Sequence, residues 1–140
     1  MGVSLVGALL DVPTQEADYR RVFAAMSQEH VDAIVVDDVF ENFTRRQLIV
    51  ELVEKAHLPA IYPWREPVEL GGLMAYAFDF PELHRYAAHQ VDQILKGAKA
   101  GEIPFYQATK FNLLINLRAA KSIGLTFPPS IMVQAGEVIE

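Results

Sequence analysis

Short apolar runs alternate along the chain with segments in which apolar residues recur every three or four positions. Val3 to Leu10 is apolar at nearly every position, and Val31 to Val36 and Pro59 to Tyr62 are shorter runs of the same kind. Such runs are typical of strands covered on both faces in a parallel sheet. The segments between them show the spacing of one helix face: Tyr19, Val22, Phe23 and Met26, then Leu48, Ile49, Leu52, Val53 and Ala56.

The same alternation continues in the second half of the chain. Leu73 to Ala77 reads as a fourth strand, and Asp79-Phe80-Pro81-Glu82 combines a capping aspartate with an early proline and a following glutamate, as at a helix start. The helix that follows has a predicted buried face and ends at Gly97: Leu83, Ala87, Val91 and Ile94. Phe111 to Ile115 reads as a last strand. Asn116 is placed to cap a short helix, and Pro128-Pro129 begins a terminal helical turn.

Strands alternating with helices predict an α/β fold, with a parallel sheet flanked by helices and built from right-handed crossovers. Sheets of this kind bind ligands outside the carboxyl ends of their strands. We therefore expect functional residues in the loops after three predicted strands, at residues 37–42, 62–68 and 76–80. The rigid proline-containing segment Pro63 to Pro67 lies within the second of these loops, and Gly71-Gly72 forms a turn before the next strand.

Composition narrows the function classes. The 140 residues include 12 basic and 18 acidic side chains, a net charge of −6, without a Lys/Arg cluster that could bind nucleic acid or an anionic membrane. There is no cysteine for a disulfide or a thiolate metal site. The closest histidines, His84 and His89, lie about 140° apart around a helix, so we expect no metal site and no cofactor. No serine lies in a nucleophile pattern and no glycines match a phosphate-binding loop, so we expect no enzymatic activity.

Six residues in or beside the strand-end loops are candidates for ligand binding: Asp37, Asp38, Phe40, Trp64, Arg65 and Tyr76. Aromatic rings and a guanidinium are suited to hold a small organic solute that carries a carboxylate, by stacking and paired hydrogen bonds. Any one of these aromatics alone is better explained by packing, because aromatic side chains dominate cores as well as sites, but their concentration at one edge favours a site for the group. The pair Asp37-Asp38 also allows an alternative, a receiver-like or phosphate-handling signalling domain that uses magnesium. The chain order disfavours it, because a receiver needs its acidic pair after the first strand.

Several stretches resemble the carboxyl-terminal half of bacterial ABC-transporter substrate-binding proteins related to the tryptophan/tyrosine-type binding proteins. The resemblance is carried by Leu58-Pro59-Ala60-Ile61-Tyr62, Arg65-Glu66, residues 68–76 through Gly71-Gly72, Ile94-Leu95-Lys96-Gly97, and the ending from Gln107 through Asn116-Leu117 and Pro128-Pro129-Ser130 to Glu140. The segment after the double glycine departs from the usual pattern, because Ala75 and Ala77 stand where the family commonly has serine and glycine.

The resemblance implies a flavodoxin-like lobe of a type 1 periplasmic binding protein, in which a small-molecule solute, for example an amino acid, is held without catalysis between two lobes that close by a hinge. Residues 1–72 would then form the carboxyl-terminal lobe, residues 73–101 a crossover strand and helix belonging to the partner lobe, and residues 102–140 the return strand and terminal helices. Tyr76 carries over as a cleft residue. The expected partner is an ABC transporter permease and the expected location is periplasmic, although the chain shows no export signal.

The predicted crossover element has an apolar face that residues 1–72 do not cover in this interpretation. We therefore expect a homodimer formed through residues 73–96. A self-associating scaffold without a ligand is the remaining alternative.

Overall fold

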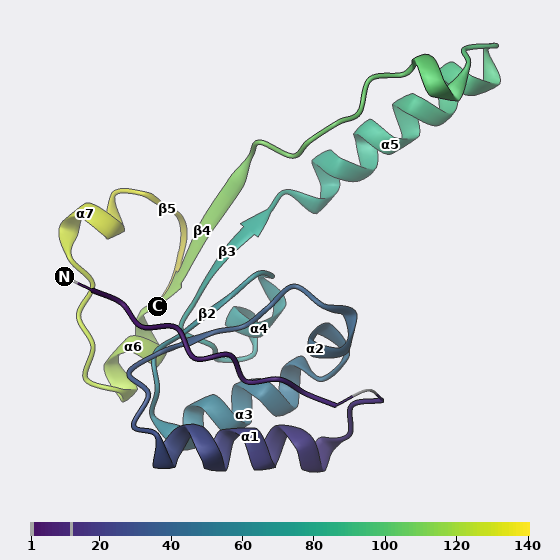
Figure 1. The fold of residues 1–140 in the computed structure, drawn as a ribbon. Helices are drawn as coiled ribbons and strands as arrows, with labels where there is room; N and C mark the ends of the chain where they lie inside the picture. Colours follow the sequence, from purple (N-terminus) through teal and green to yellow (C-terminus); the bar gives the residue numbers. More distant parts are fainter. Residues whose placement is uncertain (1, 12) are drawn as a thin grey trace.

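The structure is a computed structural model that describes residues 2–11 and 13–140. Five strands form one sheet in the order β1-β2-β3-β4-β5, with helices packed beside it (Figure 1). The strands are β1 (Ile34–Val35), β2 (Ala60–Tyr62), β3 (Met74–Phe78), β4 (Phe111–Asn116) and β5 (Ala135–Ile139). The predicted α/β class with a helix-flanked sheet is confirmed.

One strand pairing differs from an all-parallel sheet. β1 with β2, β2 with β3 and β4 with β5 are parallel, whereas β3 and β4 are antiparallel from Met74↔Ile115 to Phe78↔Phe111. β5 was not predicted, because Gly136 and Glu137 interrupt its apolar pattern and most of its residues remain exposed. The sheet is therefore mixed, with β4 running back from the end of β3.

The helices are α1 (Glu16–Gln28), α2 (Phe40–Thr44), α3 (Arg46–Ala56), α4 (Glu66–Glu69), α5 (Phe80–Leu95), α6 (Leu117–Ser122) and α7 (Pro129–Met132), with a 3₁₀ turn η1 (Ala100–Glu102). Two predicted caps are confirmed: the Asp79 carboxylate accepts from the Glu82 N–H at 2.9 Å, and the Asn116 side chain accepts from the Ala119 N–H at 3.1 Å. Gly97 ends α5 with a positive φ of 101°. The described residues contain no helix with the length and apolar character needed to cross a bilayer.

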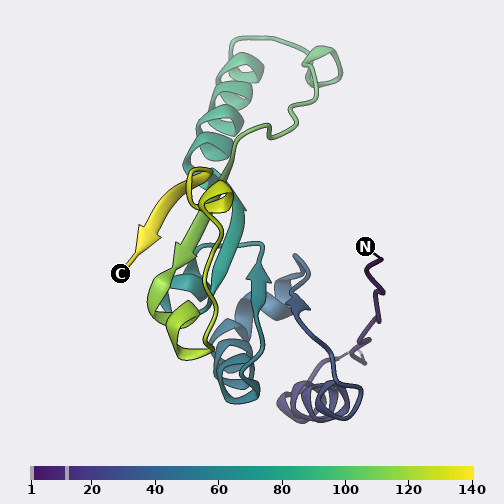
Figure 2. The ribbon, with the colours of Figure 1, turned by 90° about the vertical axis from the view of Figure 1, so that its left-hand side faces the viewer.

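The first predicted strand is wrong. Val3 to Leu10 belongs to no strand, and Val3, Leu5 and Leu9 are 87–88% exposed. In Figure 2 this segment lies off to one side of the sheet, separated from β1. An apolar run forms a strand only where a neighbouring strand offers hydrogen bonds, and nothing in the described structure pairs with this one. A smaller correction concerns Pro63 to Pro67, which was expected to be a loop throughout but enters α4 at Glu66.

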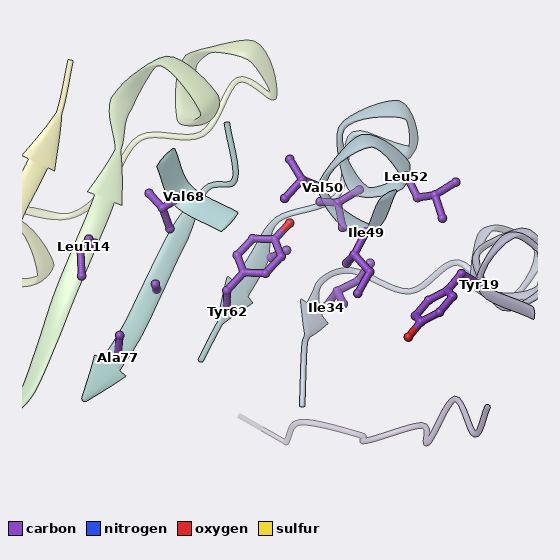
Figure 3. Close-up of a cluster of buried hydrophobic side chains, with 12 residues drawn as sticks. Tyr19, Ile34, Ile49, Val50, Leu52, Tyr62, Val68, Ala77 and Leu114 are labelled. Atoms are coloured by element: carbon purple, nitrogen blue, oxygen red, sulfur yellow. The ribbon is translucent and has the colours of Figure 1, made fainter. Parts of the chain in front are cut away.

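The hydrophobic core lies on one face of the sheet. Side chains alternate along a strand, and Ile34, Ala60, Tyr62, Ala75 and Leu114 all point to the same side. Figure 3 shows Tyr62 and Ile34 facing Val50 and Ile49 of α3. Tyr19 of α1 and Val68 of α4 complete this layer, with α1 packed on α3. The first half of the chain thus owns a core that holds β1 and β2 in place.

β3, β4 and α5 extend away from this core. Only Met74 and Ala75 of β3 pair with β2, so the rest of β3 pairs with β4 alone as a two-stranded ribbon. The ribbon leads to α5, which projects from the body in Figure 1. α5 has no buried residue, so the predicted buried face of Leu83, Ala87, Val91 and Ile94 is not buried within this chain. A stack of Tyr86 on Tyr106, with ring centroids 3.9 Å apart, ties the helix to the returning chain.

A hydrogen-bonded chain of side chains joins α1 to the loop after β1. The buried Tyr19 hydroxyl donates to Asn42 Oδ1 at 2.9 Å, and Asn42 Nδ2 donates to the Asp37 carbonyl oxygen at 3.2 Å. Burial raises the pKa of Tyr19 above its ordinary value, so the hydroxyl remains protonated as the donor. Asn42 is only 8% exposed, and its position therefore fixes the backbone at Asp37.

Gly72 is a position where a side chain does not fit. A Cβ there would lie 2.6 Å from Tyr62 Cε2 and 2.8 Å from the Pro67 carbonyl oxygen. The Pro67 oxygen belongs to the backbone, so it has little freedom to move away. We expect Gly72→Ala to lower the free energy of unfolding by about 1–3 kcal/mol, the usual cost of overpacking. Urea denaturation measures the change. Gly101→Ala is the control, because a Cβ at Gly101 meets nothing within 4 Å, and an equal loss in both variants would contradict this account.

Tyr19→Phe tests the link between α1 and Asp37. The substitution keeps the ring but leaves Asn42 Oδ1 buried without its donor, so the free energy of unfolding should fall by about 1–3 kcal/mol. Thermal and urea unfolding measure it. Tyr106→Phe removes a hydroxyl that forms no hydrogen bond with the described residues, and its effect should stay within about 0.5 kcal/mol. Unchanged stability in Tyr19→Phe would show that the hydrogen bond does not hold the loop.

Candidate functional site

The carboxyl ends of β1 and β2 meet at one edge of the sheet. The two strands are parallel neighbours with Val35 opposite Ile61, so the loop that begins at Asp37 lies beside the loop that begins at Pro63. Phe43 of α2 and Trp64 contact each other edge to face, with ring centroids 5.3 Å apart and planes at 75°, which joins the two loops directly. This edge is where ligands bind in sheets of this class.

Asp37 and Asp38 are exposed at this edge. Asp37 Oδ1 accepts a hydrogen bond from the Asp38 N–H at 2.9 Å, which bends the backbone at the strand end. Within residues 2–11 and 13–140, neither carboxylate takes part in an ion pair. The pair therefore presents negative charge to solvent, available for a cationic group of a ligand.

The two aromatic candidates of these loops differ in exposure. Phe40 begins α2 and is 76% exposed, so its ring is open to a ligand. Trp64 is only 3% exposed, because its ring packs against Phe43, over which the Arg46 guanidinium also lies at 4.8 Å. In this structure the buried Trp64 ring packs inside the protein and links the two loops. Its surface is therefore not available to contact a ligand.

Arg65 is engaged by two carboxylates of the chain itself. Its Nε donates to Glu69 Oε1 at 2.8 Å and its Nη2 donates to Glu137 Oε1 at 3.1 Å. These two hydrogen bonds raise the pKa of the Arg65 guanidinium above its ordinary value, and the bond to Glu69 contributes more than the bond to Glu137. The side chain is about half exposed and joins the start of α4 to β5. A ligand carboxylate would have to compete with these partners.

Tyr76 lies on the ribbon rather than in a loop. It is 54% exposed in the middle of β3, one residue beyond Ala75, which pairs with the last residue of β2. Its ring stacks on Phe111 of β4, with centroids 5.1 Å apart and planes within 9° of parallel. Tyr76 therefore occupies the place where the body of the lobe meets the projecting ribbon.

Several residues that shape this edge were not predicted from the sequence. Asn42 holds Asp37, Phe43 holds Trp64, and Glu137 binds Arg65. The i,i+4 spacing of Arg65 and Glu69 is a signal that sequence alone carries. The contact with Glu137 spans 72 positions, and no local pattern announces it.

Two hollows of the described surface lie away from these candidates. One of about 450 Å³ is bordered by α3, α6 and the Gly71-Gly72 turn, and the other of about 430 Å³ lies between α6 and α7. None of the six candidate residues borders either hollow. The described residues also contain no group of three His, Cys, Asp or Glu side chains that could hold a metal ion. The exposed candidate residues therefore lie outside both of these hollows.

Solved structures resemble this fold closely. An ABC domain from Streptococcus pneumoniae in complex with L-Trp has a TM-score of 0.81 and 27% identity, and a conserved domain protein from Vibrio cholerae has a TM-score of 0.80 and 23% identity; each comparison covers 89% of this chain. A substrate-binding protein with adhesive properties from Clostridium difficile, in its ligand-free open form, has a TM-score of 0.63 at 16% identity over 90% of this chain. The chain spans 42% of the length of each of these proteins. No curated protein matches the sequence significantly.

The family comparison is consistent with this likeness and covers almost every residue. The sequence matches the family described as ABC transporter substrate binding protein over residues 1–139. Proteins of this family bind a small molecule for an ABC transporter system and are not catalysts. The family match and the fold of the described residues agree: the chain belongs to the ABC transporter substrate-binding proteins.

Proposed function

We propose that this chain forms one lobe of a solute-binding protein of an ABC-type import system, and that it contributes half of a cleft for a small organic solute. The observation that carries the proposal is the convergence of the Asp37 loop and the Pro63 loop at the carboxyl edge of the sheet, in a chain of this family. Because Asp37, Phe40 and Tyr76 are exposed and border neither of the two hollows described above, a ligand bound to them would be buried only when a second lobe closes over it.

The six candidate residues have different roles in this proposal. Asp37 and Asp38 supply charge toward an ammonium group, and Phe40 and Tyr76 supply exposed aromatic surface. Trp64 positions the loop, and Arg65 contributes only if a ligand carboxylate displaces Glu69 or Glu137. An acidic pair beside exposed rings fits an amino acid with an apolar side chain, and the Streptococcus pneumoniae structure was solved with L-Trp. An amino acid is accordingly the solute class we propose.

The division of the chain supports an interlobe position for the site. We propose that residues 1–72 form the lobe proper, that residues 73–101 reach into a partner lobe, and that residues 102–140 return. β3 leaves the sheet after pairing with β2 at only two residues, and α5 buries no side chain against the rest of the chain. In this proposal the transporter permease is the protein partner and the compartment is extracytoplasmic. The receiver-like alternative gains no support, because Asp37 and Asp38 have no third acidic residue beside them in the described part.

The isolated chain should bind aromatic or branched amino acids only weakly. One lobe supplies part of the contacts and none of the closure, so we expect a dissociation constant of about 1 mM or weaker, or no measurable binding. Isothermal titration and NMR titration with L-Trp measure it, and shift changes should be confined to Asp37, Asp38, Phe40 and Tyr76. Asp38→Asn should weaken any response, whereas Glu51→Gln on the exposed side of α3 should not. A micromolar constant would show that one lobe suffices, and shifts confined to α6 and α7 would contradict the site.

The projecting element should drive association of the isolated chain. Val91, Ile94 and Leu95 of α5 are 55%, 44% and 81% exposed, and hiding roughly 600 Å² of such surface would favour association by about 15 kcal/mol before its costs of about 4–15 kcal/mol. We propose a symmetric homodimer through residues 73–96, with a mass near twice 15.7 kDa by size-exclusion chromatography with light scattering. Val91→Glu with Ile94→Lys should shift the protein toward monomer. A monomeric native chain at high concentration would refute the dimer.

A further inference from the structure

The crossover between β2 and β3 is short, and a hollow lies beside it. The only helix in this connection is α4, which is four residues long, whereas α3 in the preceding crossover has 11 residues. A parallel crossover usually carries a full helix that packs on the sheet. Next to the end of α4, with α3 and α6 on its border, the structure instead has the hollow of about 450 Å³. That volume lies within the usual range of small-molecule sites.

This hollow lies at the other end of the sheet from the candidate ligand site. Leu58 precedes β2 and Leu73 precedes β3, so both mark the amino ends of these strands. Asn116 ends β4, which is antiparallel to β3 and therefore finishes at the same end. The Asp37 and Pro63 loops, in contrast, leave the carboxyl ends of β1 and β2. A molecule bound in the hollow would therefore occupy a separate site.

The border of the hollow is mostly apolar, with charge only on exposed side chains. Its charged residues are Glu54, Glu69 and Arg118, and all three are exposed. Two carboxylates against one guanidinium disfavour a negatively charged ligand. Aliphatic side chains from α3, from the chain after α4 and from the end of α6 make up much of the rest: Val50, Val53, Leu70, Leu73 and Ile123. The hollow therefore suits an uncharged and largely apolar molecule.

One buried polar group lies at this apolar border, the hydroxyl of Tyr62. Tyr62 ends β2, but its ring extends toward Gly72 before β3 and so borders the hollow. The residue is 1% exposed, and its hydroxyl has no hydrogen-bond partner among the described residues. Figure 3 shows this hydroxyl pointing toward Val50, which also borders the hollow. Burial raises the pKa of the hydroxyl well above its ordinary value, so it stays protonated and can donate a hydrogen bond.

We propose that this hollow binds an uncharged, largely apolar ring compound that carries a carbonyl oxygen, and that the Tyr62 hydroxyl donates a hydrogen bond to that oxygen. A buried donor without an acceptor is uncommon in proteins, and a ligand carbonyl would supply the missing acceptor. The hydroxyl is already shielded from water, so this hydrogen bond requires no further dehydration of the protein. Because it is shielded, the ligand must displace the border slightly to reach it. The proposal goes beyond the proposed solute function and does not depend on it.

Three matched probes test the class of ligand on the whole chain. 1-Tetralone, a two-ring ketone, should shift the NMR signals of Val50, Tyr62, Leu73 and Ile123 and saturate with a dissociation constant of about 0.1–1 mM. Tetralin, the same ring system without the carbonyl, should shift the same signals but bind about threefold to tenfold more weakly, the usual effect of one hydrogen bond. 1-Naphthoate, an anion, should bind more weakly than 1-tetralone. Shifts confined to the hollow between α6 and α7, or to the Asp37 and Pro63 loops, would overturn the proposal.

Tyr62→Phe isolates the hydrogen bond, because it removes only the oxygen. 1-Tetralone should then bind as weakly as tetralin, and the binding of tetralin should not change. The urea midpoint should not fall, since the hydroxyl has no partner to lose. Equal binding of 1-tetralone to the native chain and to Tyr62→Phe would overturn the proposal. So would a loss of stability as large as that expected for Tyr19→Phe, because it would show that the hydroxyl is already hydrogen-bonded.

A second variant tests the hollow itself. Ala119→Phe places a ring into the hollow from α6 and should abolish the binding of both 1-tetralone and tetralin. Ala87→Phe, on an exposed position of α5, adds a ring of the same size elsewhere and should change neither. Circular dichroism confirms that each variant is folded. Unchanged binding in a folded Ala119→Phe variant would show that the probes bind at another place.

Discussion

Burial of Tyr62 between β2, α3 and the Gly71-Gly72 turn is the constraint on which the rest of the lobe depends. The ring is 1% exposed and lies so close to Gly72 that no side chain fits there. It faces Val50 of α3, and the turn above it leads directly into β3 (Figure 3). Its hydroxyl has no hydrogen-bond partner among the residues that the structure describes, and burial raises the pKa of that group well above its ordinary value. The packing of the ring must therefore outweigh an unsatisfied polar atom.

The same constraint links the core to the candidate site. Tyr62 is the last residue of β2, so the ring that anchors the strand also fixes where the Pro63 loop begins. In that loop the Trp64 ring contacts Phe43. Asn42, the residue before Phe43, donates a hydrogen bond to the Asp37 carbonyl oxygen. The exposed groups, Asp38 and Phe40, are thus next to residues that are held by contacts between the two loops. A rigid base with a few exposed polar and aromatic groups is how many small-molecule sites are built.

Sequence reasoning predicted most of the elements whose signals are local. The helix faces of α1 and α3, the caps at Asp79 and Asn116 and the stop at Gly97 all depend on neighbours within one turn, and all were confirmed. The failures concern pairing at long range. Val3 to Leu10 has the composition of a strand but no partner beside it, and β5 has a strand partner but a weak apolar pattern. The contact of Arg65 with Glu137, and the burial of Trp64, likewise depend on residues that only the fold brings together.

The antiparallel pairing of β3 with β4 determines the connectivity of the chain. Phe78 and Phe111 are register partners, so the polypeptide leaves the body and re-enters it at one point. Topologically, residues 79–110 are an excursion inserted at the tip of a hairpin. The connectivity of the body does not pass through that excursion, and a short turn joining Phe78 to Phe111 would preserve every strand neighbour on either side. Residues 79–110 can therefore change in sequence, length or shape while the rest of the fold keeps its architecture.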